Sequence, residues 1–76
     1  MPKTYVDVFD VIDDTKLTKG FEAYPAMEQE MKTLLRQAGF TLHGEFWTSE
    51  GDSFGPLSRS IHATSPENER VTLIYG

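Results

Sequence analysis

The chain has 76 residues, 38% of them hydrophobic, and a formal net charge of −5 from twelve acidic and seven basic side chains. A chain of this length forms one small domain with a single core, so residues 1–76 are expected to fold as one unit. The absence of cysteine excludes disulfides and thiolate metal sites, and the acidic balance disfavours a general nucleic-acid binder, because such proteins bind phosphates with basic side chains.

The first expected element is a strand over Thr4–Ile12. Alternation gives it two largely apolar faces, one with Val6, Val8, Asp10 and Ile12 and the other with Tyr5, Asp7, Phe9 and Val11. Asp10 would stand near the carboxyl end, where burying an unpaired charge costs several kcal/mol. Three interpretations are open: Asp10 ligates a metal, shapes a surface for a partner, or marks the hydrated end of the strand.

A helix is expected after the polar loop of residues 13–20, ending at Gly39. Pro25 suits a first helical turn, where its missing N–H costs nothing. One apolar stripe recurs at helical spacing and comprises Tyr24, Met27, Met31, Leu34, Leu35 and Ala38. Glu28 and Lys32 form an i,i+4 pair. Gly39 is expected to cap the helix in the left-handed conformation, with Phe40 folding back over the last turn.

The second half of the chain predicts further strands. Phe40–Thr48 reads as a strand with Phe40, Leu42 and Phe46 on one face and Thr41, His43, Glu45 and Trp47 on the other, and Gly44 indicates a bulge or a close backbone approach. Residues 49–56 and 65–69 are expected to be loops. Leu57–Thr64 fits a strand or two helical turns equally well, and Arg70–Tyr75 reads as a final strand.

These elements predict an α+β domain in which one main helix packs on one face of a small antiparallel sheet. If Leu57–Thr64 is helical, the order becomes a trimmed ferredoxin-like βαββαβ. If it is a strand, the order is βαβββ.

The opening segment resembles that of the small ferredoxin-like nucleases that accompany CRISPR adaptation. The matching residues are Phe9-Asp10, Asp13-Asp14-Thr15-Lys16 and Ala38-Gly39-Phe40, and the later stretches EFWTSEG and ERVTLIY are similar to strands of that family. Virulence-associated protein D and the GhoS and SinR-like proteins share the same general plan. The chain departs from this pattern in the extra stretch LTKGFEAYP and in the lack of a visible basic face.

The resemblance implies a catalytic, metal-binding role for Asp10. In that family, equivalent aspartates of two protomers meet near a two-fold axis and hold a divalent cation. A hard cation needs several oxygen ligands, so one aspartate per chain requires a symmetric mate. Asp13 and Asp14 are closer co-ligand candidates than Asp7. This hypothesis gives a metal-dependent endoribonuclease that uses Mg²⁺ or Mn²⁺. The alternative is a hydrated Asp10 that caps a turn.

The remaining polar residues give weak catalytic signals. His43 and His62 are the only histidines, and without cysteine or an i,i+4 histidine pair they make a poor zinc site. Ser58 or Ser60 could join His62 and an aspartate in a triad, but no nucleophile-elbow spacing supports one. The glycines fit no phosphate-binding motif.

The favoured hypothesis is therefore a small acidic interaction protein, without catalysis or cofactor, that binds and inhibits or regulates a protein partner. Phage–host or toxin–antitoxin conflict would suit such a protein. Trp47 and Tyr5 are candidate anchors, because aromatic residues dominate interface hot spots. Asp13, Asp14, Glu45, Glu50 and Asp52 could mimic phosphates in a partner's basic nucleic-acid-binding groove. A homodimer is also expected, because the chain has too few apolar positions to cover both sheet faces.

Direct nucleic-acid binding and membrane insertion are not expected. No apolar run approaches the about 20 residues that cross a bilayer, and the net charge is negative. These properties indicate a cytoplasmic protein.

Overall fold

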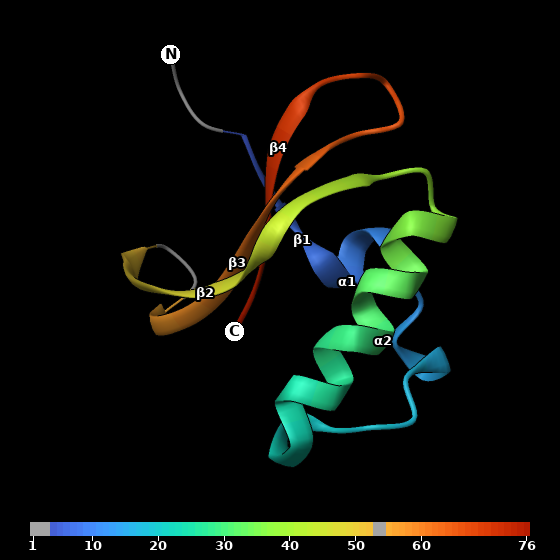
Figure 1. Ribbon diagram of the computed structural model, residues 1–76. Helices are drawn as coiled ribbons and strands as arrows, with labels where there is room; N and C mark the ends of the chain where they lie inside the picture. Colours follow the sequence, from blue (N-terminus) through green and yellow to red (C-terminus); the bar gives the residue numbers. More distant parts are fainter. Residues whose placement is uncertain (1–3, 53–54) are drawn as a thin grey trace.

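The computed structural model describes residues 4–52 and 55–76, without the side chains of residues 21, 49–52 and 55–57. It contains one long helix and a four-stranded sheet with the strand order β1-β4-β3-β2 (Figure 1). In chain order the elements are β1 (Tyr5–Asp7), α1 (Val8–Val11), the 3₁₀ turns η1 (Asp14–Lys16) and η2 (Phe21–Ala23), α2 (Tyr24–Gln37), β2 (Thr41–Asp52), β3 (Gly55–Thr64) and β4 (Arg70–Tyr75). The predicted α+β class with one main helix is confirmed.

The sheet is mixed rather than antiparallel. β2, β3 and β4 form an antiparallel meander, whereas β1 pairs with β4 in parallel. The helical segment connects β1, at one edge of the sheet, to β2 at the other edge. The meander then leads back across the sheet, so that β4 lies beside β1 and runs parallel to it. Leu57–Thr64 is a strand, and a turn joins it to β4. The order is thus the βαβββ alternative, and the ferredoxin-like βαββαβ order is not found.

The expected strand over Thr4–Ile12 is wrong beyond Asp7. The side chain of Asp7 accepts a hydrogen bond from the backbone N–H of Phe9 at 2.9 Å, so it caps the N-terminus of α1. Ile12 N–H then closes the turn onto the carbonyl of Val8 at 3.1 Å. Val8 is fully buried in this position. A local side-chain hydrogen bond therefore outweighs the strand propensity of the apolar run.

α2 forms as predicted and ends at the predicted residue. Pro25 lies in its first turn. Met27, Met31 and Leu35 are at most 1% exposed, and burial of each contributes roughly 2 kcal/mol. Gly39 adopts a φ of 98°, and Phe40 N–H bonds back to the carbonyl of Leu35 at 3.0 Å. This is the left-handed cap that the sequence predicted.

The hairpin of β2 and β3 is longer than expected. Residues 49–52 and 55–56, predicted as loop, belong to the two strands, and Ser49 pairs with Ser58. Only residues 53 and 54 of the predicted loop lie outside the described residues. The predicted bulge is confirmed, because Gly44 has a φ of 81° and the register shifts between His43 and Trp47.

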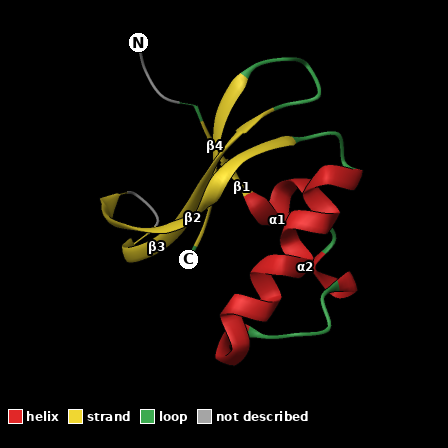
Figure 2. Cartoon of the chain, viewed as in Figure 1, coloured by secondary structure: helices red, strands yellow, loops and turns green. Residues whose placement is uncertain are grey.

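Both helices lie on one side of the sheet (Figure 2). The core between the two layers is formed by Val8 of α1, three residues of α2, and strand residues that include Phe46, Ile61, Ala63, Val71 and Leu73. Within the described residues, no helix has the length and hydrophobicity needed to cross a lipid bilayer. None of the described helices lies on the opposite side of the sheet.

Two glycines with positive φ allow a matched test of this fold. An alanine at either position adopts an unfavourable backbone conformation, which costs about 1–2 kcal/mol. A Cβ at Gly39 would also lie 3.0 Å from the ring of Pro66, whereas a Cβ at Gly44 meets nothing within 4 Å. Gly39→Ala should therefore lower the free energy of unfolding more than Gly44→Ala, as measured by chemical denaturation. Equal losses would show that the packing against Pro66 is not formed.

Candidate functional site

The sheet face that the helices leave uncovered is the candidate site, and we call it the helix-free face. Strand alternation assigns its residues, since paired positions point to the same side of a sheet. Among the residues with described side chains, it comprises Tyr5 and Asp7 of β1, Arg70, Thr72 and Ile74 of β4, Ser58, Ser60, His62 and Thr64 of β3, and Thr41, His43 and Trp47 of β2.

One lateral row of residues crosses all four strands of this face. Tyr5 pairs with Thr72, Thr72 with His62, and His62 with His43. Adjacent strands are about 4.8 Å apart, so the row spans about 14 Å. The two histidines thus face each other from the adjacent strands β2 and β3, a pairing that the sequence analysis did not predict.

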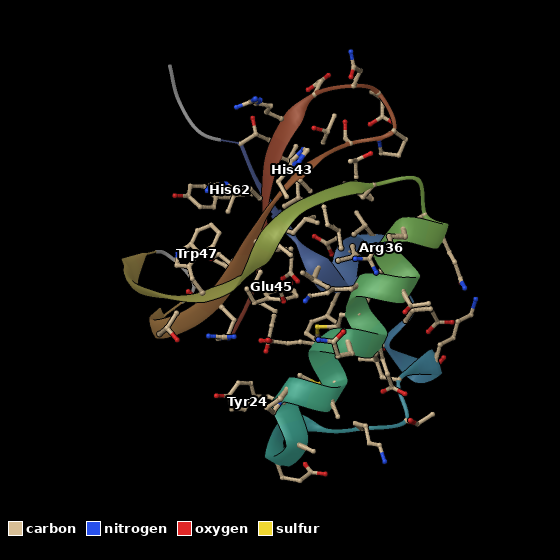
Figure 3. The ribbon with its side chains drawn as sticks, in the orientation of Figure 1. Tyr24, Arg36, His43, Glu45, Trp47 and His62 are labelled. Carbon is tan, nitrogen blue, oxygen red and sulfur yellow. The ribbon has the colours of Figure 1, made fainter. Side chains whose placement is uncertain are left out.

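A second row lies next to the first and carries Trp47. Trp47 pairs with Ser60, and its indole ring lies 4.5 Å from the imidazole of His62. The side chains of Trp47, His62 and His43 all lie on the side of the sheet opposite α2 (Figure 3). Nε2 of His43 shares a 2.8 Å hydrogen bond with the hydroxyl of Thr64, so its ring turns away from His62 and toward the neighbouring row of Thr41, Thr64 and Arg70. The two imidazoles are therefore not arranged to hold one metal ion.

Two of the three large exposed apolar side chains among the described residues lie on this face. Tyr5 is 49% exposed and Trp47 is 37% exposed. The third, Tyr24, is 47% exposed and lies at the start of α2, where the guanidinium of Arg59 sits 5.3 Å from its ring centre. The structure therefore places both predicted anchors on one face of the sheet, on its two outer strands.

The opposite side of the sheet holds a polar network that the sequence analysis missed. The carboxylate of Glu28, on α2, accepts hydrogen bonds from Nε and Nη2 of Arg59 at 2.8 and 2.9 Å. The hydroxyl of Tyr75, at the end of β4, also donates to this carboxylate. Glu28 is 6% exposed and Tyr75 is 3% exposed. One side chain of α2 is thus bonded to β3 and to β4 at once.

The charge states of this network follow from its contacts. Burial raises the pKa of Glu28, but the hydrogen bonds from Arg59 and Tyr75 outweigh burial and hold that pKa below its usual value. Burial, and then the hydrogen bond to Glu28, raise the pKa of the Tyr75 hydroxyl. Glu28 is therefore an ionised carboxylate whose oxygens are occupied by donors. This arrangement stabilises the packing of α2 and does not suit a general base.

Glu45 makes a second polar contact between α2 and the sheet, and it does not belong to the helix-free face. In the bulge, residues 44–46 lie opposite Ile61 alone. The carboxylate of Glu45 there accepts a hydrogen bond from the ammonium of Lys32, a buried residue of α2 (Figure 3). The prediction that Glu45 shares a face with His43 and Trp47 is wrong, because the bulge interrupts the alternation. Lys32 forms its ion pair with Glu45, and its charge also helps to lower the pKa of Glu28, its predicted i,i+4 partner.

The other acidic residues singled out in the sequence do not form one surface. Asp13 and Asp14 lie at η1, beside the helices, whereas Glu50 and Asp52 belong to the far end of β2, at the opposite side of the molecule (Figure 1). The side chains of Glu50 and Asp52 lie outside the described residues. The structure therefore separates the five carboxylates expected to mimic phosphates.

Asp10 lies in α1 and not at a strand end, and its side chain is exposed. The resemblance to the nucleases implied that Asp10 ends a strand, and the structure does not have this arrangement. Within the described part of the chain, no three histidine, aspartate or glutamate side chains are grouped so as to hold a metal ion. The metal-binding role of Asp10 stays a prediction without support from its surroundings.

A shallow depression of about 260 Å³ lies between α1, η1 and α2. It is lined by Phe9, Asp14, Leu17, Lys19, Gly20 and Met27. This lining has one cation and one carboxylate and lacks a hydroxyl nucleophile or an imidazole. It offers no set of groups for acid–base or nucleophilic catalysis.

Comparison with known proteins gives no family assignment. No family model matches the chain, and neither the curated proteins nor the solved structures give a significant match. Nothing in these comparisons bears on the resemblance to CRISPR-associated nucleases. The function must be inferred from the geometry alone.

Replacing Glu28 tests the network under α2. Glu28→Gln keeps the side-chain size but removes the charge that Arg59 faces, and breaking a buried pair costs about 3–5 kcal/mol. Since 27% of the Arg59 side chain is exposed, we expect a smaller loss of unfolding free energy, about 2–3 kcal/mol. Glu67→Gln, the same substitution in the exposed β3–β4 turn, is the control and should change stability by at most about 0.5 kcal/mol.

The same variant has a second readout in acid. Because the folded-state pKa of Glu28 is lowered, its stabilising effect is present above the usual glutamate pKa of about 4.3 and is lost as the pH falls through the lower folded value. The stability of Glu28→Gln should therefore fall less steeply than that of the wild type on acidification. Parallel curves would contradict the ionised state assigned to Glu28.

Proposed function

We propose that this chain is a non-enzymatic binding module that engages a protein partner through the helix-free face. The observation that carries the proposal is the placement of Tyr5 and Trp47, both exposed, on the one sheet face that lacks a helical layer. Such a module would inhibit or regulate its partner by occupying the surface it binds. The expected homodimer stays a prediction, since a second copy is one protein that this face could take.

The residue types on the helix-free face support binding. Interface hot spots are enriched in tryptophan, tyrosine and arginine, and this face carries Trp47, Tyr5 and Arg70. Two imidazoles and the hydroxyls of Thr41 and Thr64 lie around them, and these groups can exchange hydrogen bonds with a partner. A rigid sheet positions all of them before binding, which reduces the entropy lost on association.

The use of carboxylates elsewhere in the chain also favours a non-enzymatic role. Asp7 caps α1, Asp13 accepts from Thr15 in η1, and Glu30 accepts the backbone N–H groups of Thr18 and Lys19. These groups hold local structure together, and their oxygens are already bonded to N–H and O–H donors. They therefore support the fold, as Glu28 does.

The two anchors can be tested against a matched tyrosine. Random peptides displayed on phage are selected on the immobilised full-length chain, and their Kd values are then measured in solution. Tyr5→Ala and Trp47→Ala should each weaken binding by about 2 kcal/mol, or about 30-fold in Kd, because each removes a central aromatic anchor. Tyr24→Ala removes a ring of similar exposure from α2 and should leave the Kd within about twofold.

Circular dichroism of each variant controls for loss of folding in this test. Equal effects of Tyr5→Ala and Tyr24→Ala would show that the helix-free face has no special role in binding. Peptides that bind with unchanged affinity to a folded Trp47→Ala variant would lead to the same conclusion.

The nuclease hypothesis gives a different prediction. Because the described residues around Asp10 supply no metal site, RNA incubated with the chain and Mg²⁺ or Mn²⁺ should stay intact on a denaturing gel. Asp10→Asn is the matched variant. Metal-dependent cleavage by the wild type that disappears in Asp10→Asn would refute the binding module and restore the endoribonuclease.

A further inference from the structure

We infer that the helix-free face takes a short, extended peptide segment of a partner that carries carboxylate side chains. This inference rests on the proposed function and adds the chemical class of the partner. Three features of the face lead to it: its charge, its size and the spacing of its two aromatic anchors.

The helix-free face carries an exposed cation, Arg70, although the chain as a whole is acidic. The chain has a net charge of −5, but the face carries the guanidinium of Arg70 and the imidazoles of His43 and His62. Its one carboxylate with a described position, that of Asp7, is engaged as the cap of α1. Arg70 makes no ion pair among the described residues. An anionic group of a partner can therefore pair with Arg70 on this face.

The described acidic residues outside Asp7 lie away from this face. Those at α1, η1, η2 and α2 are on the helical side of the sheet, and Glu45 is directed toward Lys32. Glu67 and Glu69 belong to the turn before β4, beyond the paired strands. The acidic residues of the helical side are accompanied there by most of the described basic residues, namely Lys16, Lys19, Lys32, Arg36 and Arg59. The helix-free face differs in that Asp7 is its one carboxylate with a described position and is already bonded.

The size of the face fits a segment and not a whole domain surface. Along the strands, the face extends from Arg70 to Ile74 of β4, which is four residues or about 14 Å. Across the strands, the distance between the axes of the two outer strands is also about 14 Å. This area of about 200 Å², in which Ser60, Thr72 and Ile74 are at most 5% exposed, is about a quarter of the roughly 800 Å² that each partner buries in a standard interface. A short extended peptide matches that footprint.

The two aromatic anchors set the length of that peptide. Tyr5 lies on one outer strand, and Trp47 lies on the other, one row further along. Their backbone positions are about 16 Å apart, which about five extended residues span. An apolar side chain at each end could pack on Trp47 and Tyr5, while carboxylates accept hydrogen bonds from the His62 and Arg70 side chains. The buried hydroxyl of Ser60, which has no hydrogen-bond partner within the described residues, lies next to this path.

A nucleic acid is the other anion that aromatic side chains and arginine can bind. Each nucleotide carries a phosphate, and affinity comes from several basic side chains that neutralise them together. This face has one arginine and no lysine among its described residues, and the rest of the chain is acidic. One arginine can pair with a carboxylate of a peptide but cannot neutralise several phosphates. An oligonucleotide therefore serves as a competing probe in the test.

The test uses the peptides selected on the full-length chain and a pair of matched charge reversals. The selected peptides should be richer in aspartate and glutamate than the starting library. Arg70→Glu should weaken their binding by at least about tenfold, because it replaces a charged donor by a repelling carboxylate. Arg36→Glu makes the same charge change at an exposed position in the last turn of α2 and should leave the Kd within about twofold. Arg70→Gln should act in the same direction as Arg70→Glu if the reversal prevents folding.

The possible results separate this inference from the proposed function. Neutral or basic peptides whose binding depends on Tyr5 and Trp47 but not on Arg70 would overturn the inference and leave the binding module intact. The absence of any peptide that depends on Tyr5 and Trp47 would overturn both. A wild-type chain that sediments as a dimer, with Trp47→Ala as a monomer, would also overturn the inference, because the occupant would be a second copy. Tighter binding of labelled oligouridine than of any peptide, lost in Trp47→Ala, would assign the face to nucleic acid.

Discussion

The docking of one long helix on one face of the sheet determines everything else in this structure. An α-helix with its side chains is about 10 Å wide, so α2 and the short α1 are just sufficient to cover one side of four strands. Glu28 fixes that side, because its carboxylate accepts hydrogen bonds from β3 and from β4. Once α2 is held there, no described helix covers the opposite face. Tyr5 and Trp47 are exposed as a direct consequence of this packing.

Several of the described charges have positions that the fold itself explains. Asp7, Asp13 and Glu30 accept local backbone donors, and Glu28 and Glu45 pair with Arg59 and Lys32 across the interface of the two layers. The helix-free face keeps Arg70 and two imidazoles. Net charge is therefore a poor guide to any one surface of this protein, since the acidic residues are concentrated on the helical side.

Local signals in the sequence predicted the parts of the fold that depend on local interactions. The apolar spacing and Gly39 gave α2 and its end, and Gly44 gave the bulge. The start of α1 was missed, although an aspartate before an apolar run is a recognised N-cap signal. The Glu28–Arg59–Tyr75 network could not be predicted, because its members come from elements whose pairing depends on the whole fold. The burial of Glu28 and Lys32 could have been predicted, since their positions in the helix border the stripe of Met27, Met31 and Leu35.

The anchors Tyr5 and Trp47 were selected for their residue type alone, and their shared face emerged only from the strand order. Arg70, His43 and His62 join them through the same strand pairing. The most direct test of this account is a nuclear magnetic resonance titration of the labelled full-length chain with a selected peptide. Chemical-shift changes should cluster on Tyr5, Trp47, His62 and Arg70 and leave the exposed surface of α2 unchanged. Changes that cluster on α1 and α2 instead would contradict the account.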